Sequence, residues 1–220
     1  MAKADEDNLF GYEEVVLTIE VPTAVCGGLA EVASALKRVT NPQQMQLFWV
    51  PPTITHVSVL HTGRVREDLV GVLADAWRPV LAAAEPFSLT VRGLKFYEEG
   101  EPSVGEADGD SVRAIWASLQ GVEPLLELRE KLIAVLSDLD VQVDTEVFEP
   151  HIPLALADSF RNSREFNTAF VERQETQFGQ INVSAMSVKV SNPVEGPLDS
   201  PFTLKTSLPL GSEEEAPDGP

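Results

Sequence analysis

The chain has 220 residues, enough for one large domain or two closely packed lobes around a substantial core. Its formal net charge of −19 at pH 7 disfavours binding to long nucleic acid, which depends on Lys and Arg that neutralise phosphates. Neither a membrane-length apolar run nor the apolar core of a signal peptide is present, so we expect no membrane association. The single cysteine, Cys26, cannot form an internal disulfide, and we expect a cytoplasmic location.

Strand-like segments share either a period-two alternation or a high content of β-branched residues. We predict strands over 14–21, 56–59, 87–94, 111–119, 141–148, 151–156, 178–190 and 202–208. Residues 43–49 could form a strand or a loop.

Three segments carry apolar residues at the spacing of an amphipathic helix, over residues 23–38, 66–83 and 124–139. We also predict a polar helix that begins at Asp158 or Ser159 and ends near residue 172. Thr23 is placed to cap the first of these helices, and Trp77 in the second is expected to lie in the core. The order of strands and helices predicts an α+β fold with mixed or antiparallel sheets rather than a doubly wound sheet.

The remaining segments are expected to be irregular. We expect a flexible N-terminus over residues 1–12, one folded domain over 13–210, and an exposed loop or hairpin end over 97–110. Residues 211–220 contain acidic side chains and no basic ones, and we expect them to be a disordered acidic tail.

The most informative stretch runs from Trp49 to Gly63, where Trp-Val-Pro-Pro precedes His56-Val-Ser-Val. The alternation places His56 and Ser58 on one face of a strand, with the two valines on the other. An imidazole beside a hydroxyl suits the binding of an oxyanion and the transfer of a proton. The alternative is a surface histidine and serine on an edge strand.

A second stretch, Phe148-Glu-Pro-His-Ile-Pro-Leu-Ala, again places a histidine at the start of a short apolar run. Its alternation predicts that His151, Pro153 and Ala155 face one way. It predicts that Ile152, Leu154 and Leu156 face the other way. Two of the three histidines of the chain therefore open such strands, which favours a shared site.

These two motifs resemble those of the two-histidine phosphoesterases, the LigT-like family also named after 2′-5′ RNA ligase and cyclic phosphodiesterase. The resemblance covers about residues 14 to 208, including a segment from Ser111 that resembles the family's central strand and the Leu-rich helix after it. The second motif departs from the family pattern. Pro153 stands where Thr or Ser is expected, and Leu156 stands where many members have an arginine.

The resemblance implies two pseudo-symmetric lobes of small, mostly antiparallel sheets with outer helices around a central cleft. It implies that His56 and His151 act as general acid and base on a 2′,3′-cyclic phosphate, with Ser58 binding substrate and no metal or cofactor required. Two imidazoles can divide these roles near neutral pH, although the sequence does not say which is the acid. Pro153 supplies neither a hydroxyl nor an N–H, so half of the phosphate clamp is absent.

Three interpretations remain open. The first is a metal-independent phosphodiesterase acting on cyclic phosphates, short 2′-5′ linkages or cyclic oligonucleotides. The second is a degenerate member that binds a phosphorylated nucleotide without turnover, and the third is an acidic interaction protein that keeps only the fold. We expect a monomer that binds a small nucleotide or short oligonucleotide, and a structural or lobe-packing role for His61.

Overall fold

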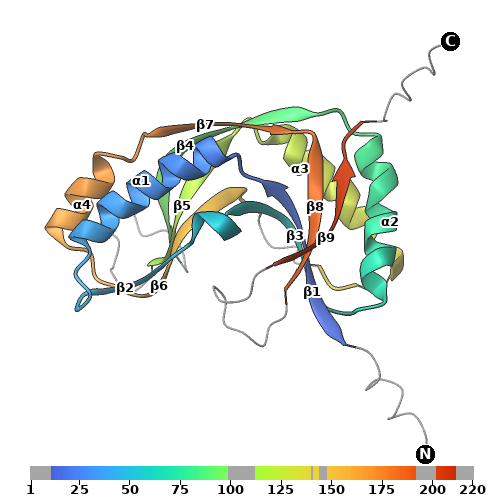
Figure 1. Cartoon of the computed structure of the whole chain (residues 1–220), viewed down its shortest axis with the longest axis horizontal. Coiled ribbons are helices and arrows are strands. Elements are labelled where there is room, and N and C mark those ends of the chain that lie inside the picture. Colours follow the sequence, from blue (N-terminus) through green and yellow to red (C-terminus); the bar gives the residue numbers. More distant parts are fainter. Residues whose placement is uncertain (1–10, 99–111, 140, 144–147, 192–201, 212–220) are drawn as a thin grey trace, which may run out of the picture.

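The computed structural model describes residues 11–98, 112–139, 141–143, 148–191 and 202–211. Within them the strands form two antiparallel sheets, one of five strands in the order β2-β6-β5-β4-β7 and one of four in the order β3-β1-β8-β9. The strands in chain order are β1 (Tyr12–Glu20), β2 (Met45–Trp49), β3 (His56–Arg66), β4 (Phe87–Glu98), β5 (Val112–Gln120), β6 (His151–Phe160), β7 (Gln177–Val183), β8 (Ala185–Ser191) and β9 (Thr203–Pro209). Figure 1 shows the two sheets as the two sides of an arch.

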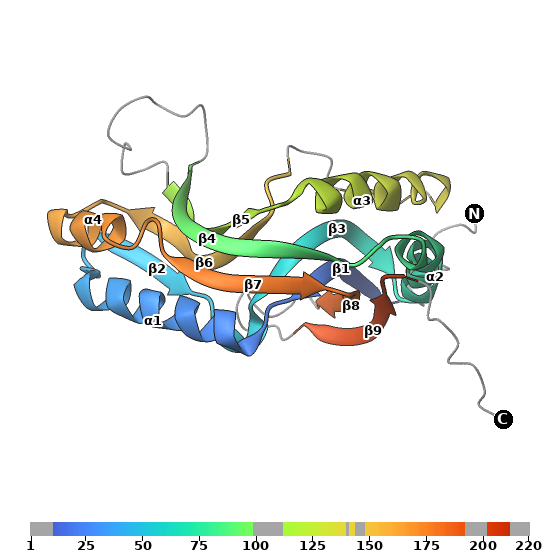
Figure 2. The ribbon, with the colours of Figure 1, turned by 90° about the horizontal axis from the view of Figure 1, so that it is seen from above.

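Each sheet carries its own pair of helices. The helices are α1 (Thr23–Val39), α2 (Leu69–Ala82), α3 (Glu123–Ala134) and α4 (Arg164–Val171), with short 3-10 turns η1 (Pro52–Ile54) and η2 (Ser137–Leu139). α1 packs against α4 and against strands of the five-stranded sheet, whereas α2 packs against α3 and strands of the four-stranded sheet. Figure 2 shows the first pair at one end of the molecule and the second pair at the other. The predicted α+β fold of two lobes with outer helices is therefore confirmed.

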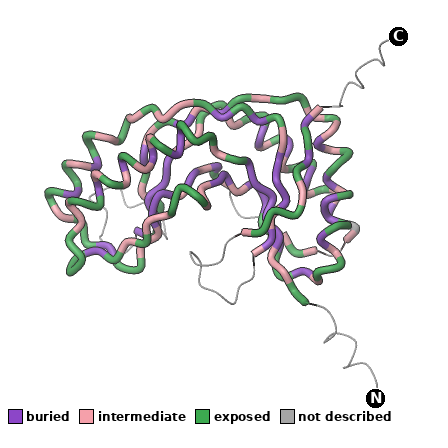
Figure 3. Tube along the Cα trace, viewed as in Figure 1, coloured by how far each residue is buried: buried purple, intermediate pink, exposed green. Residues whose placement is uncertain are grey.

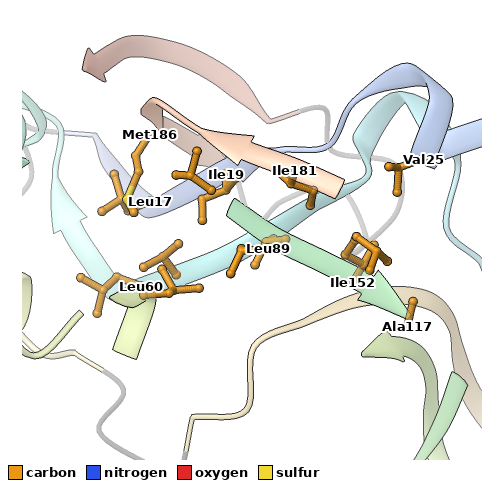
Figure 4. Close-up of a cluster of buried hydrophobic side chains, with 14 of the residues drawn as sticks. Leu17, Ile19, Val25, Leu60, Leu89, Ala117, Ile152, Ile181 and Met186 are labelled. Carbon is orange, nitrogen blue, oxygen red and sulfur yellow. The ribbon is translucent and has the colours of Figure 1, made fainter. Parts of the chain in front are cut away.

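The chain crosses between the sheets several times, so the lobes are not separate in sequence. β7 and β8 are separated by Ser184 alone, yet they belong to different sheets. The buried apolar side chains form one contiguous cluster that includes Leu17 of β1, Leu89 of β4 and Ile152 of β6, and Figure 4 draws part of it. Figure 3 shows this burial along both sides of the arch. A contiguous core of this kind is what one domain, rather than two separate ones, is expected to have.

Several predicted boundaries are wrong. The expected helix over 158–172 begins only at Arg164, because β6 continues to Phe160, which pairs with Met45 of β2. Ser163 caps this helix, its Oγ accepting a hydrogen bond of 3.2 Å from the N–H of Phe166. Thr23 is not a cap, since Pro22 occupies the N-cap position of α1 and no side chain bonds there.

Other predicted elements differ in extent. Residues 43–49 contain strand β2 at the edge of the larger sheet, and the expected strand 178–190 divides at Ser184. Of the expected strand 141–148, the described residues form only an isolated bridge between Val143 and Thr62. Trp77 is fully buried as predicted, and its Nε1–H donates a hydrogen bond of 3.3 Å to the carbonyl of Leu132.

Three predictions fall largely on residues that the structure does not describe. The flexible N-terminus lies outside the described residues up to position 10, the exposed loop from 99 to 110, and the acidic tail from 212 onward. Among the helices within the described ranges, none has both the length and the apolar character needed to cross a membrane.

Candidate active site

His56 is the first residue of β3, and the turn of η1 immediately precedes it. Its Nδ1 lies 2.8 Å from the carbonyl oxygen of Ile54, which can only accept, so Nδ1 carries the proton and Nε2 is the free basic atom of the neutral ring. The side chain is buried, with 8% of its surface exposed, and the ring of Phe202 packs edge-on against it at 4.9 Å. The imidazole is thereby fixed in both tautomer and orientation.

His151 has the same arrangement at the start of β6. Its Nδ1 lies 2.8 Å from the carbonyl oxygen of Glu149, again two residues earlier, and the ring lies 3.9 Å from that of Trp116. β3 and β6 approach each other closely where the two sheets meet. Each sheet therefore contributes one histidine whose Nε2 is the ring atom left for chemistry.

Two β-bulges shape the face of β3 that carries His56. Ser58 pairs with Thr18 but Leu60 pairs with Leu17, so Val59 is an extra residue whose carbonyl accepts a hydrogen bond of 3.0 Å from Arg129 Nε. A second shift in the register of the β1–β3 pairing follows His61. There the Thr62 hydroxyl bonds to both the N–H and the carbonyl of Val15, at 3.2 and 3.1 Å.

The first of these bulges brings His61 onto the same face as His56 and Ser58. The three residues pair with Val16, Glu20 and Thr18, which are alternate residues of β1 and therefore share one side of the sheet. His61 is exposed on that face rather than packed between lobes. The exposure of His61 argues against the expected lobe-packing role, whereas the alternative of a structural role stays a prediction.

A matching bulge lies in β6. Pro153 pairs with Trp116 whereas Ala155 pairs with Ile115, which makes Leu154 the extra residue. Leu156 then lies on the face of His151 and Pro153, so the prediction that Leu156 and Ile152 share a face is wrong. A proline is tolerated in this inner strand because a bulge interrupts the ladder there.

The environment of His56 keeps its ring neutral. Burial lowers the pKa of His56 to about 4, and the nearby charges of Lys189 and His61 act in the same direction. The carbonyl of Ile54 and the carboxylate of Glu20 oppose this fall. Burial also lowers the pKa of His151, with a further contribution from His61. His61 thus lies within electrostatic range of both other histidines.

An ion pair lies beside His56. Lys189 of β8, with 14% of its side chain exposed, places Nζ 2.7 Å from Oε1 of Glu20. Burial alone would raise the pKa of Glu20, but its bonds and charge interaction with Lys189, its bond with Ser187 and the charge of His56 bring it below the ordinary value. A nearly buried ammonium therefore lies near His56 and is already partnered.

The sequence reasoning missed Lys189, Glu20, Trp116 and Ser118. Ser118 lies directly across from His151 in the β5–β6 ladder, and its hydroxyl is buried without a hydrogen-bond partner among the described residues. Alternation along 111–119 could have placed Trp116 and Ser118 on one face. The pairing register that brings that face to His151 is not readable from one chain.

No group of three or more His, Cys, Asp or Glu side chains suited to a metal ion occurs within the ranges that the structure describes. Cys26 of α1 is buried, its Sγ lies 3.6 Å from the carbonyl of Val21, and burial raises its pKa. A thiol in this state is a core residue and a poor nucleophile.

Two α+β lobes, each with a histidine at the start of a bulged strand, define the class of the two-histidine phosphoesterases. The profile of the 2′-5′ RNA ligase superfamily matches residues 27–188, and the chain belongs to this family. The chain is 21% identical over 164 residues to an RNA 2′,3′-cyclic phosphodiesterase of Methanothermobacter thermautotrophicus, covering 74% of this chain and 84% of that protein.

Solved structures agree with this assignment of the fold. TT0787 of Thermus thermophilus superposes with a TM-score of 0.70 at 19% identity, covering 91% of this chain and 99% of that one. E. coli LigT in complex with 3′-AMP superposes with a TM-score of 0.68 at 14% identity, with the same coverage of the two chains.

Proposed function

We propose that the protein is a metal-independent phosphodiesterase that opens 2′,3′-cyclic phosphates, with His56 and His151 as its acid–base pair. The observation that carries this proposal is the matched state of the two imidazoles. Each opens a bulged strand of a different sheet, each is bonded through Nδ1 to the carbonyl two residues earlier, and both are within electrostatic range of His61. The named activity of the archaeal relative and the 3′-AMP bound to LigT support the substrate class.

The environments of the two rings favour His56 as the base. A pKa of about 4 leaves Nε2 of His56 unprotonated at neutral pH, so it can accept a proton from water as the water oxygen attacks phosphorus. Burial lowers the pKa of His151, and this fall is partly offset by the hydrogen bond to the Glu149 carbonyl and then by the charge of the Glu149 carboxylate. In its protonated form His151 gives the Nε2 proton to the ribose oxygen as the P–O bond breaks.

The phosphate is held mainly from the side of β3. Ser58 shares a face with His56, and its hydroxyl can donate a hydrogen bond to a non-bridging oxygen. Pro153 lies at the matching position of β6 and has no donor to offer. The clamp is thus one-sided, which sets the expected rate below that of a member with both hydroxyls.

The proposal is tested by assaying the purified full chain against adenosine 2′,3′-cyclic phosphate, a 2′-5′ dinucleotide and a cyclic dinucleotide, with and without EDTA. We expect turnover of the 2′,3′-cyclic phosphate that EDTA does not change. Turnover abolished by EDTA and restored by a divalent metal would contradict the proposal.

A second function is favoured by Pro153 and Leu156, which remove the hydroxyl and the cation that the family motif leads one to expect. A protein that binds these nucleotides in calorimetry but converts none of them would be a nucleotide-binding member without catalysis. A protein that neither binds nor converts them would retain only the fold, and its acidic surface would then be the feature that partners meet.

A further inference from the structure

Three aromatic rings lie one against the next on the face of the larger sheet that carries His151. The indole of Trp116 in β5 has its centroid 3.9 Å from that of the His151 imidazole, with 37° between the two planes. So short a separation between ring centres requires the rings to meet face to face rather than edge to face. Trp116 also contacts Tyr97 of β4, whose ring centroid lies 4.8 Å away at an angle of 35°. The imidazole of His151 therefore packs on an indole that has a second aromatic neighbour.

Two buried tryptophans differ in what their indole N–H groups do. Trp77 is a core residue, and its Nε1–H donates a hydrogen bond to the carbonyl of Leu132. Trp116 is also buried, with 7% of its surface exposed, yet its Nε1–H has no hydrogen-bond partner among the described residues. A buried donor without a partner destabilises a fold, so its retention calls for a reason other than packing. The contact between the Trp116 ring and His151 supplies one.

Charged groups face His151 from several elements within the described part of the chain. The Glu149 carboxylate lies in the segment before β6, and it is paired with Nζ of Lys95 from β4. His61 of β3 lies within electrostatic range, and Arg129 of α3 lies 4.4 Å over the aromatic ring three residues before His151. These charges are of both signs. They do not by themselves offset burial, which holds the pKa of His151 below its ordinary value.

The face of an indole supplies what these charges do not. It carries a negative electrostatic potential that attracts a cation within about 6 Å of the ring centre, and tryptophan does this best among the aromatic side chains. A protonated His151 is such a cation, whereas the neutral ring gains only ordinary packing. His56 has a different neighbour, because it contacts Phe202 at 4.9 Å with the two rings nearly perpendicular. The two histidines therefore differ in how well an adjacent aromatic ring accommodates a positive charge.

We propose that Trp116 is a positioning residue that holds the His151 ring and favours its protonated form, so that His151 serves as the general acid. The role of His151 as acid rests on the proposed function, whereas the contact between the two rings does not. Tyr97 packs against the indole and limits its movement.

The direct test is an NMR titration of the three histidines in the full chain, with His151 assigned by the loss of its signals in His151→Gln. Trp116→Leu removes the aromatic face, and we expect it to weaken proton binding to His151 about three- to tenfold. Trp116→Phe keeps an aromatic ring and should restore part of this loss.

The direction of the change separates the proposal from simple packing. If Trp116 acted only by packing, the smaller leucine would admit water and strengthen proton binding to His151, because burial is the largest cause of its lowered pKa. A stronger or an unchanged proton affinity of His151 in Trp116→Leu would therefore overturn the proposal.

A second replacement keeps the shape of the indole, so it remains informative if Trp116→Leu does not fold. The protein is produced with fluorinated tryptophan, whose ring face carries less negative potential at nearly the same size. The label replaces all three tryptophans, but within the described residues Trp116 is the one whose ring contacts a histidine. The proton affinity of His151 should fall stepwise with the number of fluorine atoms, while that of His56 stays constant. No dependence on fluorine content would contradict the role of the ring face.

Phe48→Leu is the matched control, because Phe48 is an exposed aromatic residue on the same face of the sheet. It pairs with Leu156, which shares the face of His151. This variant should leave the titration of His151 at its wild-type position. A fall in proton affinity as large as that in Trp116→Leu would show that the effect does not come from the contacting ring, and would overturn the proposal.

The pH dependence of kcat/KM for adenosine 2′,3′-cyclic phosphate links the ring contact to the reaction. Because a general acid must be protonated, Trp116→Leu should move the alkaline limb to lower pH and leave the acidic limb, set by His56, in place. A shift of the acidic limb instead would make His151 the base and overturn the proposal. The NMR titration needs no turnover, so a chain that hydrolyses no cyclic phosphate would contradict the proposed function alone, and the titration would still decide the role of Trp116.

Discussion

His56 combines two requirements that usually conflict, burial and a polar function. The ring is almost wholly withdrawn from solvent, yet its Nδ1–H is satisfied by the carbonyl of Ile54. Burial disfavours the imidazolium, and Lys189 and His61 add to that cost, whereas Glu20 opposes it only in part. The ring is therefore neutral at neutral pH, which is the state that the proposed role as base requires, and this state has a consequence for stability.

The stability of the protein should fall as pH decreases from about 6.5 to about 4. In this window the unfolded chain protonates His56 while the folded chain does not, so the unfolded state binds more protons and gains stability as pH falls. The full effect is about 3 kcal/mol. It should be visible as a difference between wild type and His56→Gln in denaturant unfolding at pH 7 and pH 4. Parallel pH profiles of the two proteins would contradict the assigned burial of a neutral ring.

Alternation along the sequence placed His56 and Ser58 correctly on one face but failed for Leu156, and if extended along β3 it would also fail for His61. Both failures have the same cause, a single extra residue in the strand that shifts every later side chain to the opposite face. Val59 and Leu154 are ordinary apolar strand residues, and nothing in their type marks a bulge. Lys189 and Glu20 were missed for a different reason, since their contact depends on strand pairing across most of the chain.

At the scale of elements, β3 depends on hydrogen bonds that the regular ladder does not supply. The Thr62 hydroxyl takes the place of a strand partner for Val15, donating to its carbonyl and accepting from its N–H. Thr62, at 4% exposure, and Val15, at 0%, are both buried, so water cannot replace these bonds. The second bulge of β3 therefore depends on one hydroxyl group.

Replacing Thr62 by Val keeps the shape of the side chain and removes both hydrogen bonds. Because two buried backbone groups of Val15 lose a partner, we expect a loss of about 2 kcal/mol in the free energy of unfolding. Thr53→Val, at an exposed position of η1, is the matched control and should change stability by less than about 0.5 kcal/mol. Denaturant titration measures both, and equal stabilities of the two variants would show that the Thr62 hydroxyl does not hold the bulge.

For the whole molecule, the resemblance of two short motifs to a known family predicted the arrangement of the lobes, which analysis of single elements could not. The hydrophobic period and the residue propensities predicted most strands and helices but left open which strands pair. Only the resemblance to the family implied two lobes with one motif strand in each. The structure places β3 and β6 in different sheets that approach each other over a shared core. That arrangement is a property of register and topology, which local sequence patterns do not encode.

The central claim is that His56 and His151 act as one acid–base pair on the same phosphate. It is tested most directly by comparing kcat for His56→Ala, His151→Ala and the double variant on adenosine 2′,3′-cyclic phosphate. Each single change should cost about 10²–10⁴-fold. Because the two residues act as a unit, the double variant should be little slower than the slower single one. Losses that multiply in the double variant, or a single variant that retains wild-type kcat, would contradict the claim.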